Sequence, residues 1–158
     1  MGSPAPQDLE RIEQELNGMI GPIGEPEEVP VELLSVVRLA LAVEDFDPIH
    51  YDLKAAQARG YRGIVAPWPI LALLRYNCAH QEEHHAFSFG RAYVHGEDSY
   101  EFFEPIVVGD MITVSTAITE TRLKQGRSGL LGLVTSERCY TNQLGQLCAV
   151  MRTITIRR

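Results

Sequence analysis

The stretch GYRGIVAPWPILALLRY, residues 60–76, decides the fold of this chain. Glycine and proline crowd its first half, which predicts a tight loop, and apolar residues fill its second half. Proline is tolerated in the first turn of a helix, so we expect a helix to begin near Trp68. A helix that is apolar on every side has to be covered by other parts of the chain. The sequence therefore predicts a buried helix with a second layer wrapped around it.

Four long segments after residue 91 are predicted to supply that layer. They are rich in Val, Ile, Thr and Tyr and are separated by Gly-, Pro- and Asn-containing turns, a pattern typical of strands. The links are short, so we expect antiparallel hairpins. Helices followed by antiparallel strands predict an α+β fold with the sheet curled around the helix. The expected strands are Tyr93–Phe103, Met111–Leu123, Gly129–Thr141 and Gln146–Arg157.

The residues before the glycine-rich loop predict shorter elements. We expect an amphipathic helix over 8–18, an extended segment over 19–28 and a largely buried helix over 31–44. Asp52 is placed to cap a further helix over 53–59, which Gly60 ends. We divide the chain into an N-terminal extension with a short helix, 1–17, and one domain, 18–158.

Composition narrows the class of protein. The formal net charge is −7, from 14 Lys and Arg against 21 Asp and Glu, and no basic run occurs. This argues against nucleic acid or an anionic membrane as the main partner. Apolar runs fall far short of the roughly 20 residues that a membrane span needs. Three cysteines without a CxxC pair, and no signal-like N-terminus, predict reduced thiols in a cytoplasmic protein.

The candidate site lies in VEDFDPIHYD, residues 43–52. Asp47-Pro48 ends any helix that arrives from the N-terminal side, because proline pushes the residue before it out of the α region. Asp45 and His50 then lie on either side of a bend, where both side chains can point to one place. A carboxylate beside an imidazole suits general acid–base chemistry. The alternative is an ordinary Asx-turn with a surface histidine.

The motif Asp45-x-Asp47-Pro48-x-His50 resembles the MaoC-like hydratase/dehydratase family of the hot-dog fold, in which a sheet wraps a central helix. The (R)-specific enoyl-CoA hydratases of that family carry D-x-N-P-x-H, so Asp47 replaces an asparagine here. Three further stretches resemble the N-terminal type of MaoC dehydratase domain. They are GYRGIVAP at 60–67, HGEDSYEF at 95–102 and FEPIVVGD at 103–110.

The resemblance implies a hydro-lyase for reversible hydration of a 2-enoyl thioester to a 3-hydroxyacyl thioester, carried by coenzyme A or an acyl carrier protein. Asp45 and His50 would be the acid–base pair, and Asp47 would support the turn and orient His50. Neither a cofactor nor a metal is implied. We expect a homodimer formed by pairing of sheet edges.

One stretch departs from the family pattern. The hydratases read I-V-H-G before the central helix, and the glycine N–H is the expected donor to the thioester carbonyl. This chain reads Ile64-Val65-Ala66-Pro67, and proline has no N–H. Either Ala66 or Trp68 supplies the donor, or the site is impaired. The Ala-Pro version is typical of partner-type domains, so the alternative is a non-catalytic or co-catalytic subunit of a heteromeric dehydratase.

Several other residues allow two interpretations. Ile64, Val65 and Tyr51 are candidates for substrate binding. His95 either lines the site or belongs to a structural turn, and Trp68 either shapes an acyl pocket or fills the core. The histidines of residues 80–85 lack the Glu that a zinc-protease helix places after its first histidine, so a solvated helix end is favoured over a metal site. Residues 66–80 contain no Asp or Glu, which counts against a thioesterase.

Overall fold

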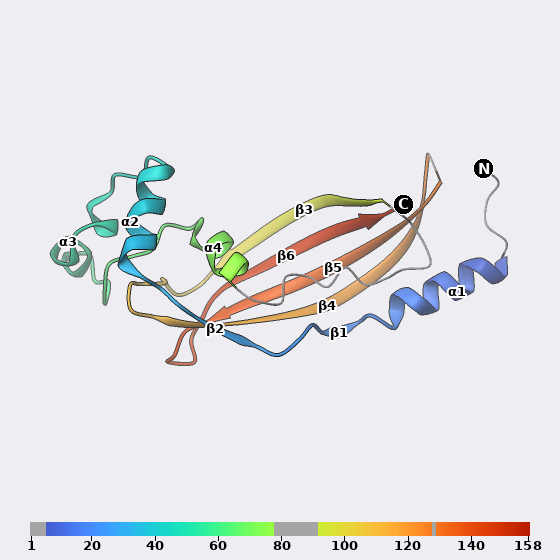
Figure 1. Ribbon diagram of the computed structural model, residues 1–158, viewed down its shortest axis with the longest axis horizontal. Helices are drawn as coiled ribbons and strands as arrows, with labels where there is room; N and C mark the ends of the chain where they lie inside the picture. The colour runs from blue at the N-terminus through green and yellow to red at the C-terminus, as the bar shows by residue number, and fades with distance from the viewer. Residues whose placement is uncertain (1–5, 78–91, 128) are drawn as a thin grey trace.

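A six-stranded antiparallel sheet dominates the structure, a computed structural model that describes residues 6–77, 92–127 and 129–158 (Figure 1). Its strand order is β1-β4-β5-β6-β3, with β2 also pairing with β4. The long strands twist together, as right-handed strand twist requires. The strands are β1 (Gly21–Pro22), β2 (Glu27–Pro30), β3 (Tyr93–Phe102), β4 (Met111–Gly126), β5 (Gly129–Thr141) and β6 (Leu147–Arg157).

The four predicted long strands are confirmed, but one predicted pairing is wrong. β3 pairs with β6 and not with β4, so the two are not a hairpin. Residues 103–110, between β3 and β4, pair instead with the loop before the central helix, through a bridge between Val65 and Val107. These residues connect β3, at the edge of the sheet, to β4, which lies beyond β6 and β5. Among the residues that the structure describes, β3 pairs with β6 alone and so forms an edge of the sheet.

The central helix α4 (Ile70–Asn77) packs against the sheet. Ile70, Leu71 and Leu74 are buried in the main core, together with Tyr140 of β5, whose hydroxyl donates to the Leu71 carbonyl at 3.3 Å. Leu73 is exposed, so the sheet covers only one side of the helix turns that the structure describes. The prediction that α4 is covered all round is therefore wrong for a single chain.

A second, smaller core lies along β4. It is formed where α1 (Pro6–Asn17) places Ile12 and Leu16 against Ile118 and Val134. Figure 1 shows α1 near one end of the sheet and the shorter helices near the other. None of the helices in the described ranges is long and apolar enough to pass through a membrane.

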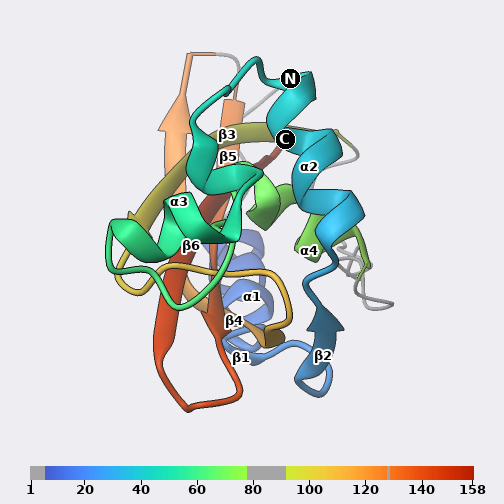
Figure 2. The ribbon, with the colours of Figure 1, turned by 90° about the vertical axis from the view of Figure 1, so that its left-hand side faces the viewer.

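The helix α2 (Leu33–Ala42) is far less buried than its sequence predicts. Val36 and Ala40 are buried, but Leu33, Leu34 and Leu41 are 48%, 56% and 52% exposed. The prediction of a largely buried helix is wrong because α2 lies at the end of the sheet, where one side of it meets the main core (Figure 2).

Two short elements follow α2 at the same end of the molecule (Figure 2). They are the 3-10 helix η1 (Pro48–His50) and the helix α3 (Leu53–Ala58). The side chain of Asp52 accepts a hydrogen bond from the Lys54 N–H at 2.7 Å, so the predicted cap of α3 is confirmed. These elements carry the candidate site.

Candidate active site

The end of α2 positions Asp45. Glu44 adopts the left-handed conformation, with φ of 56°. The Asp45 N–H donates to the Ala40 carbonyl at 2.9 Å and the Glu44 N–H to the Leu41 carbonyl at 3.2 Å. This is the Schellman pattern of helix termination, which glycine usually provides at the left-handed position. The chain therefore leaves α2 abruptly, and Asp45 is the first residue beyond the cap.

The predicted bend follows at once. The side chain of Asp47 accepts a hydrogen bond from the Ile49 N–H at 3.1 Å and so caps η1, with Pro48 in its first turn. The Asp47 N–H in turn donates to Oδ1 of Asp45 at 3.2 Å. The bend brings the side chains of Asp45 and His50 together.

The two side chains are in direct contact. Nε2 of His50 lies 3.1 Å from Oδ2 of Asp45, and its Nδ1 lies 2.7 Å from the carbonyl oxygen of Val65. A carbonyl oxygen only accepts, so Nδ1 carries a proton and donates it. The Asp45 carboxylate can accept from Nε2 when that nitrogen also carries a proton, so the contact offers a route for proton transfer between the two side chains.

Burial differs sharply within the pair. His50 is 5% exposed, whereas the side chain of Asp45 is 43% exposed. Tyr51 contacts both residues of the pair. Its hydroxyl donates to the Asp45 backbone carbonyl at 2.7 Å, and its ring packs edge-on against the ring of His50. The structure thus places Tyr51, a predicted substrate-binding residue, as a support of the bend.

Asp47 contributes through the bend and through Arg59. The guanidinium of Arg59 donates to Oδ2 of Asp47 at 2.6 Å. This hydrogen bond, with a smaller contribution from the Ile49 N–H, lowers the pKa of Asp47 below its ordinary value. The ring of His50 is held by Asp45 and Val65, so any orienting effect of Asp47 is indirect.

The loop before α4 contacts both sides of the site. The Val65 N–H donates to the Ile49 carbonyl at 3.0 Å, and the Ala66 N–H donates to the Ile106 carbonyl at 2.9 Å. The Ile64 carbonyl accepts from the Val108 N–H at 2.8 Å, and the Ile64 side chain packs against the main core. Ala66 therefore has no free N–H for a ligand, and Ile64 lies outside the cavity described next.

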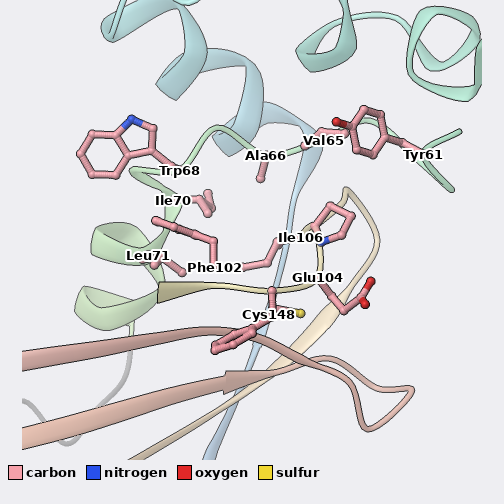
Figure 3. A pocket seen from close by; sticks show the side chains of 12 residues that line it. Tyr61, Val65, Ala66, Trp68, Ile70, Leu71, Phe102, Glu104, Ile106 and Cys148 are labelled. Carbon is pink, nitrogen blue, oxygen red and sulfur yellow. The ribbon is translucent and has the colours of Figure 1, made fainter. Parts of the chain in front are cut away.

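A cavity of about 320 Å³ opens beside this loop (Figure 3). Val65 links the cavity to the acid–base pair, because it lines the cavity and its carbonyl oxygen accepts from His50. Asp45 and His50 themselves are not among the lining residues. Apolar and aromatic side chains, among them Trp68 and Phe102, form much of its wall. Figure 3 shows the indole of Trp68 at one end of the lining and the carboxylate of Glu104 toward the other.

Trp68 lies at the rim of the cavity and not in the core. It is 63% exposed, and its ring meets Tyr100 edge-on at a centroid distance of 6.1 Å. Of the two interpretations of Trp68, the structure favours the pocket wall. The backbone N–H of Trp68 makes no hydrogen bond with any part of the chain that the structure describes.

His95 is not among the residues that line the cavity, so its role in substrate binding stays a prediction. It lies within β3 opposite Thr155, next to a bulge, and its side chain is 57% exposed and 3.5 Å from Asp98. Phe102, at the cavity, is seven positions further along the strand, or about 23 Å at about 3.3 Å per residue. The histidines of residues 80–85 lie outside the described residues, among which no group of three potential metal ligands occurs.

Three polar residues of the cavity were not assigned to the site from the sequence: Tyr61, Glu104 and Cys148. Glu104 belongs to the stretch 103–110, but nothing in the sequence distinguishes it from a surface glutamate. Cys148 is one of the three cysteines that the sequence predicts to be reduced thiols. It is buried, and this burial, together with the negative charge of Asp110, raises the pKa of the thiol, so the reactive thiolate is disfavoured.

A family model described as the FAS1-like dehydratase domain region matches residues 18–151. The chain belongs to this family. The FAS1-like dehydratase domain is also 28% identical over 150 residues to a UPF0336 protein of Clavibacter michiganensis, covering 92% of this chain and 96% of that protein.

Solved structures agree with the family assignment. A MaoC-like dehydratase is 26% identical, with a TM-score of 0.73 over 90% of this chain, and this chain spans 43% of its length. The HadBC (3R-hydroxyacyl-ACP dehydratase) complex of Mycobacterium tuberculosis has a TM-score of 0.69 at 21% identity, covering 87% of this chain and 96% of that chain. The predicted resemblance to MaoC-like dehydratases and the predicted hot-dog fold are confirmed.

Proposed function

We propose that this FAS1-like dehydratase domain catalyses the reversible hydration of a 2-enoyl thioester, with Asp45 and His50 as the acid–base pair. The observation that carries the proposal is the contact between Nε2 of His50 and Oδ2 of Asp45. Val65, whose carbonyl holds His50, also lines a largely apolar cavity. The acyl group would be carried by coenzyme A or an acyl carrier protein.

The pair can serve both proton transfers of the reaction. In hydration, the oxygen of water bonds to the β-carbon and the water loses one proton to the pair. The π electrons of the double bond then form the new α C–H bond with a proton that the pair returns. The pair ends with the protons it began with, and dehydration is the same sequence in reverse.

The thioester carbonyl becomes enolate-like on the way and needs a donor. Of the two donors that the sequence leaves open, the Ala66 N–H is already bonded to the Ile106 carbonyl. Trp68 lines the cavity and stands just before α4, and its backbone N–H makes no hydrogen bond with the described residues. We assign the donor role to the Trp68 N–H, where the positive end of the helix dipole adds to it.

A second candidate function is that of a subunit in a heteromeric dehydratase. Two observations favour it: the loop lacks the N–H at Pro67, and the aromatic residues Trp68, Phe102 and Phe103 are exposed at the cavity. The similar HadBC structure is described as a complex. A partner chain would then complete the cavity of this chain.

The deciding experiment follows enoyl-thioester absorbance with crotonyl-CoA and a longer enoyl-CoA. Asp45→Asn and His50→Ala should each lower turnover by at least about 10²-fold, a typical general acid–base contribution. Asp52→Asn is the matched control, because Asp52 caps α3 and makes no contact with His50. Equal turnover in wild type and both variants would remove the assignment.

Two further readouts separate the alternatives. Release of free thiol in place of hydration would indicate a thioesterase. A chain that is inert alone and becomes active when a second hot-dog chain is added would support the heteromeric subunit.

A further inference from the structure

The geometry points to Asp110 as a positioning residue for His50, acting through the loop before α4. This inference rests on the role proposed for His50. Asp110 has a fully buried side chain, with 0% exposure. Its carboxylate accepts hydrogen bonds from the Arg62 guanidinium, from the Val107 N–H at 2.9 Å and from the Gln143 side chain at 3.1 Å.

Two of these donors belong to segments that pair with each other. Arg62 is in the loop before α4, and Val107 is in the connection between β3 and β4. Asp110 therefore joins the two segments by a hydrogen bond to each. The third donor, Gln143, anchors the carboxylate to the turn between β5 and β6.

The two segments are also tied directly. Val65 and Val107 form a bridge, the Ala66 N–H donates to Ile106 and the Val108 N–H donates to Ile64. Gly63 adds close packing, because a Cβ built on it would lie 3.1 Å from the Val107 side chain. A shift of residues 106–108 is therefore transmitted to residues 63–66.

The loop in turn holds His50. The Val65 carbonyl is the acceptor for Nδ1 of His50 at 2.7 Å, and the Val65 N–H donates to Ile49, the residue before His50. Displacing Val65 would lengthen the contact that fixes the ring and its tautomer, as supporting hydrogen bonds do for histidines in other sites. Asp110 thus reaches His50 through Val107 and Val65 without touching it.

A role in stability alone predicts something different from a positioning role. Loss of a buried ion pair weakens any fold. Only a positioning role also changes the state of the His50 ring in protein that remains folded. The decisive readout is therefore the Nδ1 proton of His50, observed by NMR of the full chain labelled with ¹⁵N-histidine.

The test compares Arg62→Gln and Asp110→Asn with the control Glu137→Gln. Glu137 pairs with Arg152 at 2.8 Å within the sheet, outside the loop. We expect the Nδ1 proton to exchange with solvent about tenfold faster in both loop variants, because a change of that size corresponds to the loss of one hydrogen bond. In the control the exchange rate should be unchanged. If Asp110→Asn does not fold, Arg62→Gln carries the test, since the Arg62 side chain is partly exposed.

Activity provides a second measure. Arg62→Gln should lower kcat by about 10-fold to 10²-fold, as small displacements of a catalytic group do, and should have no further effect in a His50→Ala background. An unchanged Nδ1 proton in folded Arg62→Gln protein would overturn the inference. If every thioester is inert with the wild type, the proposed function fails, but the NMR comparison still decides whether Asp110 positions His50.

Discussion

The two ring nitrogens of His50 face the Asp45 carboxylate and the Val65 carbonyl oxygen. Asp110 is a buried carboxylate that binds the loop to which Val65 belongs. Burial by itself raises the pKa of Asp110. The hydrogen bonds from Arg62, the Val107 N–H and Gln143 outweigh that effect, so the pKa lies below its ordinary value. The folded state therefore binds the charged form of this carboxylate better than the unfolded chain does.

This shift predicts how stability depends on pH. Because the pKa is lower in the folded state, the contribution of Asp110 is fully present above its unfolded value of about 3.9 and is lost as the pH falls through the folded value. Asp110→Asn should lower the free energy of unfolding by roughly 1–3 kcal/mol at neutral pH, because buried donors lose a charged acceptor while the Arg62 side chain is itself partly exposed. Urea denaturation at several pH values checks this. The difference between wild type and variant should shrink in acid, and a constant difference would contradict the assignment.

The Trp68 N–H makes a second prediction at the scale of one residue. Trp68→Pro removes this N–H and should lower kcat by about 10²-fold or more, the typical loss for one donor to a developing oxyanion. Trp68→Ala is the control, because it removes the indole from the cavity wall but keeps the N–H. Steady-state kinetics with both variants separates the donor from the side chain. Equal losses in the two would show that the indole matters and the N–H does not.

At the scale of elements, the end of α2 carries strain beside the site. Glu44 has φ of 56°, a conformation that costs a residue with a Cβ about 1–2 kcal/mol. Strain of this kind gathers where a chain must turn sharply to present functional groups. Here it directs Asp45 toward His50 directly after the helix.

Glycine at this position should relieve the strain. Glu44→Gly should raise the free energy of unfolding by about 0.5–1 kcal/mol, since part of the gain is offset by the greater freedom of glycine in the unfolded chain. Glu32→Gly is the matched control, because Glu32 flanks the other end of α2 with φ of −89°. Thermal or urea denaturation of the two variants measures the effect. Stabilisation by Glu32→Gly but not by Glu44→Gly would contradict it.

At the scale of the whole molecule, the exposed apolar surface is the main feature. β3 is an edge strand, and α2 exposes leucines on its outer side. Long uncovered edges favour pairing with another chain. The partial burial of the apolar helix α4 agrees with such pairing, because a second chain bound at the β3 edge would cover the exposed side of α4.

The homodimer that the sequence predicts can be tested at this edge. The 17.6 kDa chain should sediment at twice its mass when purified alone. Val94→Lys in β3 should weaken the dimer by at least about tenfold, since burying one large apolar side chain contributes about 1.5–3 kcal/mol. Leu144→Lys, in the exposed turn between β5 and β6, should leave the dimer intact. A monomeric wild type would favour the heteromeric alternative.

The sequence by itself determined those features that depend on neighbouring residues. The long strands follow from their content of Val, Ile, Thr and Tyr and from the turn residues between them. The cap of α3 follows from Asp52, and the meeting of Asp45 and His50 follows from the bend at Asp47-Pro48. These are effects of local sterics and short-range hydrogen bonds, which a run of ten residues already contains.

Tertiary structure alone decided which distant groups meet. Four features join residues far apart in the chain. They are the pairing of β3 with β6, the hydrogen bond of His50 to the Val65 carbonyl, the hydrogen bond of the Ala66 N–H to the Ile106 carbonyl, and the hydrogen bonds of Asp110. The exposure of α2 likewise depends on where the sheet ends, because an apolar helix sequence is the same whether or not another element covers it. Such contacts are selected by the packing of the whole chain, and no local pattern records them.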